Sequence, residues 1–326
     1  MDKFCDHTFA LFDHEFADHA SHMCMIKDHA RCMGFFEQIK KHCKGKKVID
    51  FGAGTGILGI YASLCGAEEV WFIENQTNLH ATIHELCELN NVQNYSIHYD
   101  VTKAPTHYFD VCISETLGDM GIERNFTRIF SDLIARNPGC IAIPDTINLY
   151  KSTLYLEEVE KEKRYIENFP INLKHNMLYP LPGLRPTRID SHPVDNEQLI
   201  FNLDLKNFPR VDDLRRIDKV EHPKEHNFMI FHWKAFVNGE EFVNNNPGRS
   251  SDNFNHWCQL GFYMPKDNTL GIKLDIQRGP FVLCGNPHQD FVDKPKEYDD
   301  KYYEPSPDQY VQDINQPTDS VIKWTM

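Results

Sequence analysis

The residues best suited to chemistry include three glycines at alternating positions, Gly52, Gly54 and Gly56, which follow a short apolar run and precede a helix-like segment. A strand that ends at Asp50 and reverses through these glycines lets a ligand approach the backbone closely, because no Cβ atom stands in the way. A second apolar run ends at Glu74, 18 residues after Gly56, where a ribose diol needs an acceptor. The turn and its two acids therefore predict a nucleoside cofactor; the alternative is a glycine-rich turn with nothing bound.

The spacing of these glycines fits two classes of cofactor. Gly54, Gly56 and Gly59 follow the G-x-G-x-x-G pattern of dinucleotide sites in a shifted frame. Gly52, Gly54 and Gly56, with Asp50 two residues before the first of them, better fit the turn of S-adenosylmethionine-dependent methyltransferases. Those enzymes bind an amino-acid end at this turn and no pyrophosphate. The spacing therefore favours S-adenosyl-L-methionine as the cofactor.

A pair of carboxylates forms the second set of chemically capable residues. Glu115 stands at the end of the apolar run that includes residues 111–113, and Glu123 follows eight residues later across a glycine-containing loop. Ligands of open α/β sheets bind at the carboxyl ends of the strands. Two carboxylates there can hold a planar cation with several donors, and guanidinium has that shape. The plain alternative for Glu115 is an acid on a surface loop.

These residues need a sheet to position them, and the chain from Lys47 to about Pro144 alternates strand-like apolar runs with helical segments. The predicted strands are Val48 to Asp50, Val70 to Ile73, Ser96 to His98, Val111 to Ile113 and Cys140 to Ile143. This alternation predicts a Rossmann-like α/β domain with a doubly wound parallel sheet. Residues 1–46 are expected to form helices before it, because Met23, Ile26 and Met33 belong to an apolar stripe at helical spacing.

After Pro144 the pattern changes to short alternating runs separated by Pro, Gly and Asn, which is typical of an antiparallel β-barrel or sandwich. Residues 157–168 have a charged helical pattern, and 170–195 are expected to be loop. The expected strands are Leu199 to Leu205, Phe228 to Val237, Trp257 to Met264 and Thr269 to Ile276. The predicted organisation is an N-terminal helical segment (1–46), an α/β domain (47–144) and a β-barrel domain with a C-terminal tail (145–326).

The composition limits the classes of binding partner that we expect. The formal net charge of −14 predicts that nucleic acid is repelled and that a basic ligand is attracted. No apolar run approaches the roughly 20 residues that a membrane span needs, and the first residues lack the pattern of a secretory signal. The 10 cysteines include no C-x-x-C pair, and the His and Cys residues between Cys5 and Cys32 match no zinc-finger spacing. We expect no metal site, no nucleic-acid or membrane partner, and a cytoplasmic location, or a nuclear one in a eukaryote.

Several segments resemble the class I protein arginine methyltransferases and their bacterial relatives, and the resemblance covers most of the chain. Val48 to Gly56 resembles the family's cofactor motif, Glu74 its ribose-binding acid, and Ser114 to Glu123 its double-glutamate loop. Asn255-His256-Trp257, followed by Phe262 to Met264, resembles the family's Thr-His-Trp loop and the strand after it. Asp100 falls where relatives contact the adenine edge.

The resemblance also gives roles to a helix that includes Cys24 to Arg31. Met25, Asp28 and Arg31 are spaced i, i+3, i+6, which places them on one broad face. The resemblance implies that Met25 and Arg31 contact the cofactor, Arg31 through the methionyl carboxylate. It implies that Asp28 pairs with His256 across the two domains, and that His256 takes part in a proton relay.

Two departures from the family pattern concern the substrate site. The loop from Glu115 to Glu123 is one residue shorter than is usual in the eukaryotic enzymes, so Asp119 or a shifted Glu123 supplies the second carboxylate. Phe12 and Phe16 stand where those enzymes usually have tyrosines, and the lost hydroxyls would change how a guanidine is oriented.

The function that the resemblance implies is N-methylation of the guanidino group of arginine in a protein or peptide. One alternative is methylation of free arginine or another small guanidino compound. The other is a catalytically silent methyltransferase-like subunit that binds a partner protein. A homodimer also fits the resemblance, and residues 157–195 would contain its dimerisation arm.

Overall fold

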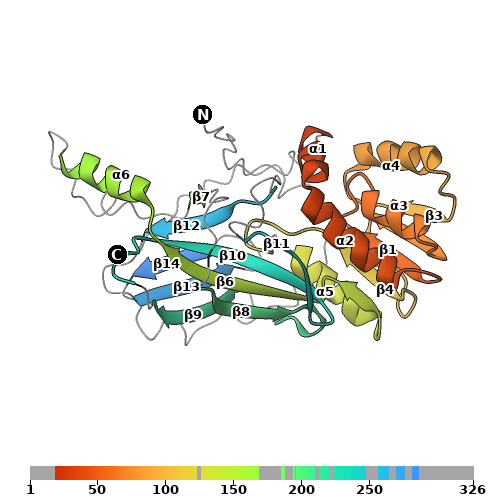
Figure 1. The fold of residues 1–326 in the computed structure, drawn as a ribbon. Coiled ribbons are helices and arrows are strands. Elements are labelled where there is room, and N and C mark those ends of the chain that lie inside the picture. Colours follow the sequence, from red (N-terminus) through yellow and green to blue (C-terminus); the bar gives the residue numbers. More distant parts are fainter. Residues whose placement is uncertain are drawn as a thin grey trace.

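The computed structural model of the chain describes residues 19–122, 126–168, 185–187, 194, 196–209, 213–220, 223–246, 256–263, 269–275 and 281–285. In Figure 1 a parallel sheet with its helices lies at one end of the molecule and antiparallel sheets lie at the other. The helices of this described part are α1 (His19–Lys27), α2 (His29–His42), α3 (Ile57–Leu64), α4 (Thr77–Leu89), α5 (Phe126–Arg136) and α6 (Glu157–Glu167), with the 3-10 turns η2 (Val101–Lys103) and η3 (Leu205–Asn207).

The parallel sheet has the strand order β3-β2-β1-β4-β5, and the predicted Rossmann-like sheet is confirmed. Its strands are β1 (Lys47–Phe51), β2 (Glu69–Ile73), β3 (Tyr95–His98), β4 (Val111–Ser114) and β5 (Ile141–Ile143). The order reverses between β1 and β4, whose last residues Phe51 and Ser114 are register partners. The loops after these two strands therefore leave the same edge at the switch point, where open α/β sheets bind ligands.

Close packing fixes the helix that follows β1. Helix α3 begins after Gly56 and lies over β2, where a Cβ atom on Gly59 would come 2.3 Å from Cε1 of Phe72. Only glycine fits at that contact, since real Cβ atoms do not approach a neighbouring carbon so closely. Gly59 therefore serves the packing of helix on strand.

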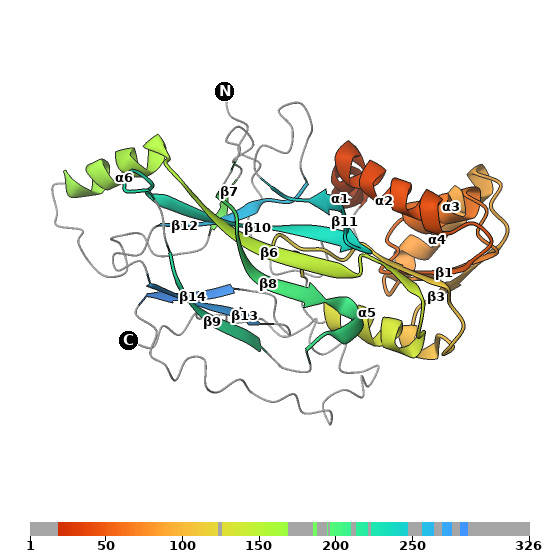
Figure 2. The same ribbon diagram turned by 60° about the horizontal axis from the view of Figure 1, so that its bottom comes forward.

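The antiparallel part consists of two sheets, in agreement with the predicted fold class. Figure 2 shows β9, β13 and β14 in a separate layer beside β6, β8 and β10. The larger sheet has β7 (Arg185–Thr187), β12 (Gln259–Tyr263), β10 (Phe228–Val237), β6 (Thr146–Leu154) and β8 (Gln198–Asp204) in this order, with β11 (Glu240–Asn244) also on β10. The smaller sheet has the order β14 (Phe281–Gly285), β13 (Thr269–Asp275), β9 (Asp213–Lys219). The predicted strands at 257–264 and 269–276 thus belong to different sheets.

Contacts between the two parts are built into the core. One hydrophobic cluster runs from the parallel sheet into the larger antiparallel sheet and includes Trp233, which is fully buried. Helix α2 lies against β11, where the rings of Phe35 and Phe242 meet edge to face with centroids 5.0 Å apart. The change from parallel to antiparallel strands falls between β5 and β6, and the division into segments 1–46, 47–144 and 145–326 stays a prediction.

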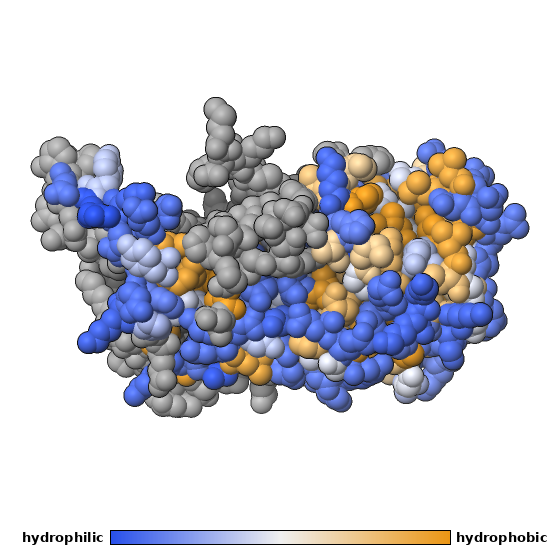
Figure 3. Space-filling model, viewed as in Figure 1, coloured by the Kyte–Doolittle hydropathy of each residue, from blue (hydrophilic) through white to orange (hydrophobic). Residues whose placement is uncertain are grey.

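The surface carries an apolar region at the end formed by the N-terminal helices. Figure 3 shows apolar residues gathered over this end of the molecule, while the visible part of the antiparallel end is mostly hydrophilic. Met23, Ile26, Met33 and Leu64 are exposed large apolar side chains of α1, α2 and α3. None of the described helices is long and apolar enough to cross a membrane.

Candidate active site

The glycine turn (residues 52–56) and the acidic loop (residues 115–122) leave the sheet side by side. Gly52, Gly54 and Gly56 have φ angles of +73°, +56° and +80°, a region that favours glycine. A Cβ atom on Gly52 would lie 2.6 Å from Cγ2 of Thr116 in the acidic loop. The glycine turn and the acidic loop therefore contact each other at one edge of the sheet.

Two buried acids hold the glycine turn. Asp50 Oδ2 accepts the N–H of Gly59 at 2.9 Å, and Glu74 accepts from Gly54 N–H through Oε2 and from Gln76 N–H through Oε1, both at 2.7 Å. Burial raises the pKa of Asp50 to about 7, and the nearby charges of Glu74 and Glu115 add to the shift. Burial also raises the pKa of Glu74, against the effect of its backbone donors. Glu74 lies at the end of β2 as predicted, and its oxygens bind backbone in this structure.

Asp100 has a local partner. It follows β3 and caps η2, with Oδ1 accepting the Thr102 N–H and Oδ2 the Thr102 hydroxyl, both at 2.8 Å. The contact with adenine that the resemblance implies for Asp100 stays a prediction.

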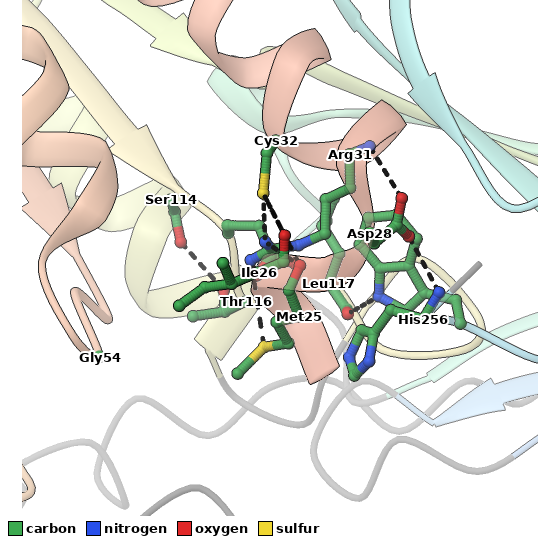
Figure 4. Close-up of polar contacts among 12 residues, drawn as sticks. Met25, Ile26, Asp28, Arg31, Cys32, Gly54, Ser114, Thr116, Leu117 and His256 are labelled. Atoms are coloured by element: carbon green, nitrogen blue, oxygen red, sulfur yellow. Dashed lines mark hydrogen bonds and ion pairs between the residues drawn. The ribbon is translucent and has the colours of Figure 1, made fainter. Parts of the chain in front are cut away.

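Asp28 joins the N-terminal helices to the antiparallel part of the structure, the C-terminal domain. It is fully buried between α1 and α2, and its Oδ1 accepts the N–H of Arg31 at 2.9 Å as the N-cap of α2. Its Oδ2 accepts the backbone N–H of His256, also at 2.9 Å (Figure 4). The predicted pair of Asp28 and His256 therefore meets through the backbone of His256.

Arg31 is the cation of the site. Its side chain is about as buried as that of Glu115, at 5% and 7% exposure, and its Nη2 forms an ion pair with Glu115 Oε2. Nη1 donates to the Met25 carbonyl at 3.2 Å, Nη2 lies 4.0 Å from Met25 Sδ, and the buried Nε has no hydrogen-bond partner among the described residues. Burial raises the pKa of Glu115, and the charge of Arg31 limits that shift. The guanidinium thus has one donor left for a further anion.

His22 is a site residue that the sequence argument did not single out. It is buried on α1, and a Cβ atom on Gly54 would lie 2.6 Å from its Cε1. The imidazole therefore covers the middle of the glycine turn. Its position three residues before Met25, on the same helix face, is a signal that the sequence did contain.

One of the two candidates for the second carboxylate lies outside the described residues. Glu123 lies in the undescribed segment 123–125, and Phe12 and Phe16 lie before residue 19. Asp119 is described, and its Oδ1 accepts the backbone N–H of Cys258 at 2.9 Å. Of the two alternatives, Asp119 therefore already serves the contact with the C-terminal domain.

The acidic loop is held by side chains that the sequence argument did not predict as site residues. Three successive carbonyls of the loop accept hydrogen bonds from the C-terminal domain. The donors are Nε1 of Trp257 to Leu117 at 2.7 Å, Nε1 of Trp233 to Gly118 at 3.0 Å and Nδ2 of Asn245 to Asp119 at 2.9 Å. No spacing in the sequence connects these residues to the loop.

The arrangement can bind two charged ligands next to each other. A turn with glycine at three of its five positions and the acid at the end of β2 suit a nucleoside, and the unpaired Nε–H of Arg31 suits a carboxylate. Glu115 suits a guanidinium, because it already binds one. Among the described residues there is no group of three or more His, Cys, Asp or Glu side chains that could hold a metal ion.

Comparison with known proteins agrees with this geometry. Residues 29–132 match the family model described as ribosomal protein L11 methyltransferase (PrmA). Probable protein arginine N-methyltransferase 6 of Arabidopsis thaliana is 29% identical over 171 residues, 49% of this chain and 38% of the relative. Protein arginine N-methyltransferase 1 of Dictyostelium discoideum is 23% identical over 303 residues, 85% of this chain and 82% of the relative. The match thus spans less than half the length of the first of these relatives.

Solved structures establish the likeness of fold. The open conformation of Arabidopsis thaliana protein arginine methyltransferase 10 superposes with a TM-score of 0.61 at 13% identity, covering 82% of this chain and 97% of that one. The Trypanosoma brucei PRMT1 enzyme-prozyme heterotetrameric complex with AdoHcy gives 0.61 at 16% identity, covering 81% and 92%. The resemblance seen in the sequence is therefore confirmed in sequence and in fold.

Proposed function

We propose that this chain, which is similar in sequence and fold to the class I protein arginine methyltransferases, is an S-adenosylmethionine-dependent N-methyltransferase acting on the guanidino group of arginine in a protein or peptide. One observation carries the proposal. Glu115, at the switch point of the sheet, has a buried side chain that is paired with a guanidinium, that of Arg31. A substrate arginine presents the same group to the same carboxylate.

The residues present fit the proposed cofactor. The three glycines add no side chain of their own over the backbone of the turn, Glu74 stands where a ribose diol needs acceptors, and Arg31 has a free donor for the amino-acid carboxylate. Met25 lies beside Arg31 with its sulfur at 4.0 Å from Nη2. When bound, S-adenosyl-L-methionine supplies a methyl group on a sulfonium, which is an electrophile.

The proposed role of the chain's own residues is to orient the substrate guanidinium more than to activate it. Glu115 holds the guanidinium in one orientation and draws its positive charge away from the attacking nitrogen. Glu123 is the proposed second carboxylate, since Oδ1 of Asp119 already binds Cys258. His256, whose backbone is fixed by Asp28, is the proposed proton acceptor after transfer.

The test is a transfer assay with S-adenosylmethionine labelled in its methyl group. The acceptors are an Arg/Gly-rich peptide, free arginine and buffer alone, so the assay separates a peptide substrate from a small guanidino compound. We expect label in the peptide. Label only in free arginine would move the assignment to the small-molecule alternative. Binding of S-adenosylhomocysteine without transfer to any basic acceptor would favour the silent subunit.

A substitution of Glu115 tests whether this residue holds the substrate guanidinium. Glu115→Gln keeps the size of the side chain and removes its charge, so turnover should fall at least about 100-fold with nearly unchanged affinity for S-adenosylhomocysteine. Glu85→Gln, at an exposed position of α4, is the matched control and should retain activity. Retained turnover in Glu115→Gln would remove the guanidinium clamp from this residue.

Assembly and location belong to the same proposal. The exposed apolar side chains on α1, α2 and α3 support a homodimer, because a surface of this kind is more stable when a second copy covers it. Light scattering after size exclusion measures the mass, and a monomer at micromolar concentration would contradict the dimer. The proposed location is cytoplasmic, or nuclear in a eukaryote.

A further inference from the structure

Asn245 occupies a central position between the C-terminal domain and the acidic loop. It follows β11 directly and is fully buried. Its Nδ2 donates to the carbonyls of Asp119 and Cys258, both at 2.9 Å, and its Oδ1 accepts the N–H of Trp233 at 2.7 Å. Both the amino group and the oxygen of the amide therefore form hydrogen bonds, and these bonds join three segments that are distant in the sequence.

The neighbours of Asn245 leave little freedom to the acidic loop. Gly121 closes a turn by donating its N–H to Gly118 at 2.8 Å, and a Cβ atom on Gly121 would lie 2.8 Å from Cγ of Trp233 and from Cγ2 of Ile147. The loop thus lies directly on the sheet that carries Trp233. Packing against the sheet holds the acidic loop on this surface. The hydrogen bonds to the carbonyls of the loop fix its position along the surface.

We propose that Asn245 is a positioning residue for Glu115, acting through the acidic loop; this rests on the proposed function. Glu115 is four residues before Asp119, and the contacts at Asp119 fix where the loop ends. A carboxylate that must align a guanidinium with a methyl donor tolerates little displacement, because a shift of about 1 Å costs on the order of 100-fold in rate. The side chain is an amide because the position needs two donors and one acceptor without a charge.

A purely structural role is the competing explanation, and a second buried asparagine provides the control. Asn227 lies in the same domain, accepts the Leu156 N–H at 2.8 Å and donates to the Leu156 carbonyl and to Glu160 at 2.9 Å. It has the same number of side-chain hydrogen bonds as Asn245 but none to the acidic loop. Asn227→Ala therefore measures the cost of losing a buried amide alone.

The experiment compares Asn245→Ala with Asn227→Ala in the full chain. We expect both to lower the melting temperature, and only Asn245→Ala to lower kcat, by about 10- to 100-fold. The dissociation constant for S-adenosylhomocysteine should change less than about twofold in both. Amide hydrogen exchange should accelerate in the acidic loop of Asn245→Ala and not in that of Asn227→Ala.

A gentler variant keeps the test decisive if Asn245→Ala does not fold. Trp233→Phe removes the N–H that binds Gly118 and keeps an aromatic ring in the core. It should lower kcat by about 3- to 10-fold, with faster exchange in the acidic loop. Unchanged kcat and unchanged loop exchange in the variants that fold would overturn the proposal.

The two proposals fail in different ways. If the wild-type chain transfers no methyl group to any guanidino acceptor, the proposed function fails. The hydrogen-exchange comparison then still measures whether Asn245 fixes the acidic loop. If transfer occurs and Asn245→Ala behaves like Asn227→Ala, the proposed function stands and the positioning role is rejected.

Discussion

Asp50 is a buried carboxyl group beside the glycine turn. Only 1% of its surface is exposed, and its Oδ2 binds the N–H of Gly59 at the start of α3. Burial raises its pKa to about 7, and the negative charges of Glu74 and Glu115 add to this. The folded protein is therefore more stable when Asp50 is protonated. In the unfolded chain the same side chain ionises at the ordinary pKa of a carboxyl group.

This gives a stability prediction with a defined sign. Because the folded pKa is raised, the stabilising contribution of the protonated form is lost as pH rises through about 7, so the free energy of unfolding should fall by about 1 kcal/mol between about pH 6 and 8. Asp50→Asn can still accept from Gly59 and has no charge, so its stability should lack this fall. Chemical denaturation of both proteins at several pH values measures it. An equal slope in Asp50→Asn would mean that another group titrates.

Single residues also show what the sequence could predict about the site. The positions of Asp50, Glu74 and Glu115 followed from the strands that contain or precede them, since a strand brings its last residues to a known edge of the sheet. The pair of Arg31 with Glu115 did not follow, because 84 residues separate them and only the packing of α2 brings them together. The hydrogen bond between Asp119 and the backbone of Cys258 could not be predicted from the sequence for the same reason.

At the scale of elements, helix α1 and the glycine turn depend on each other. His22 on α1 lies where a side chain on Gly54 would be, at 2.6 Å from the position of the Cβ atom. The absence of a side chain at Gly54 thus serves the helix above it as well as a bound ligand. A conventional interpretation of the motif considers only the ligand.

Substitutions at two glycines separate the effect of the positive φ angle from the effect of the contact with His22. Gly54→Ala should lower stability through its φ of +56° and through the clash with His22, whereas Gly45→Ala has a φ of +68° and nothing within 4 Å of the added atom. We expect Gly45→Ala to cost about 1 kcal/mol and Gly54→Ala clearly more, with weaker cofactor binding as well. Adding His22→Ala to Gly54→Ala should recover part of the loss. Denaturant titration of the four proteins is the measurement, and equal losses for both glycines would show that α1 moves away at no cost.

The elements that the sequence predicted are those with uniform apolar faces. Strands β1, β2, β4 and β5 are short, mostly buried apolar runs, and β10 is a longer and mostly buried apolar run, so their patterns were visible. Strands β6 and β9 were missed because each has a charge on an inward face. Lys151 and Asp218 form a buried ion pair at 2.7 Å between the two antiparallel sheets, which breaks the apolar pattern of both strands. The pairing that makes such charges acceptable exists only after the sheets have stacked.

At the scale of the whole molecule, the net charge of −14 acts on every basic ligand that approaches. A peptide with several arginines interacts with this field along its length, whereas free arginine carries a carboxylate as well as its two cationic groups. The charge therefore favours peptides over the free amino acid, independently of the contacts in the site.

Ionic strength tests this preference. Raising the salt from about 50 to about 300 mM should raise the KM for an Arg/Gly-rich peptide several-fold, because the screening length falls below about 10 Å. The KM for free arginine, if it is a substrate at all, should change little, and so should kcat for the peptide. Steady-state kinetics at three salt concentrations measure this. A peptide KM that is independent of salt would mean that local contacts alone select the substrate.

The ion pair of Arg31 with Glu115 has a consequence for how the two ligands affect each other's binding. Glu115 in this state is already neutralised by an internal guanidinium, so an incoming one must compete with Arg31. An anion that binds the free Nε–H of Arg31 weakens that internal pair. The two ligands should then show reciprocal thermodynamic linkage, each raising the affinity for the other by the same factor.

Calorimetry can measure the linkage without turnover. S-adenosylhomocysteine should tighten the binding of a substrate peptide about 5-fold or more. 5′-Methylthioadenosine, which has the nucleoside and no carboxylate, should not. Equal effects of the two compounds would show that the nucleoside, and not the carboxylate at Arg31, transmits the signal. The arginine of α2 would in that case be only a ligand-binding residue, and the linkage between the two ligands would need another origin.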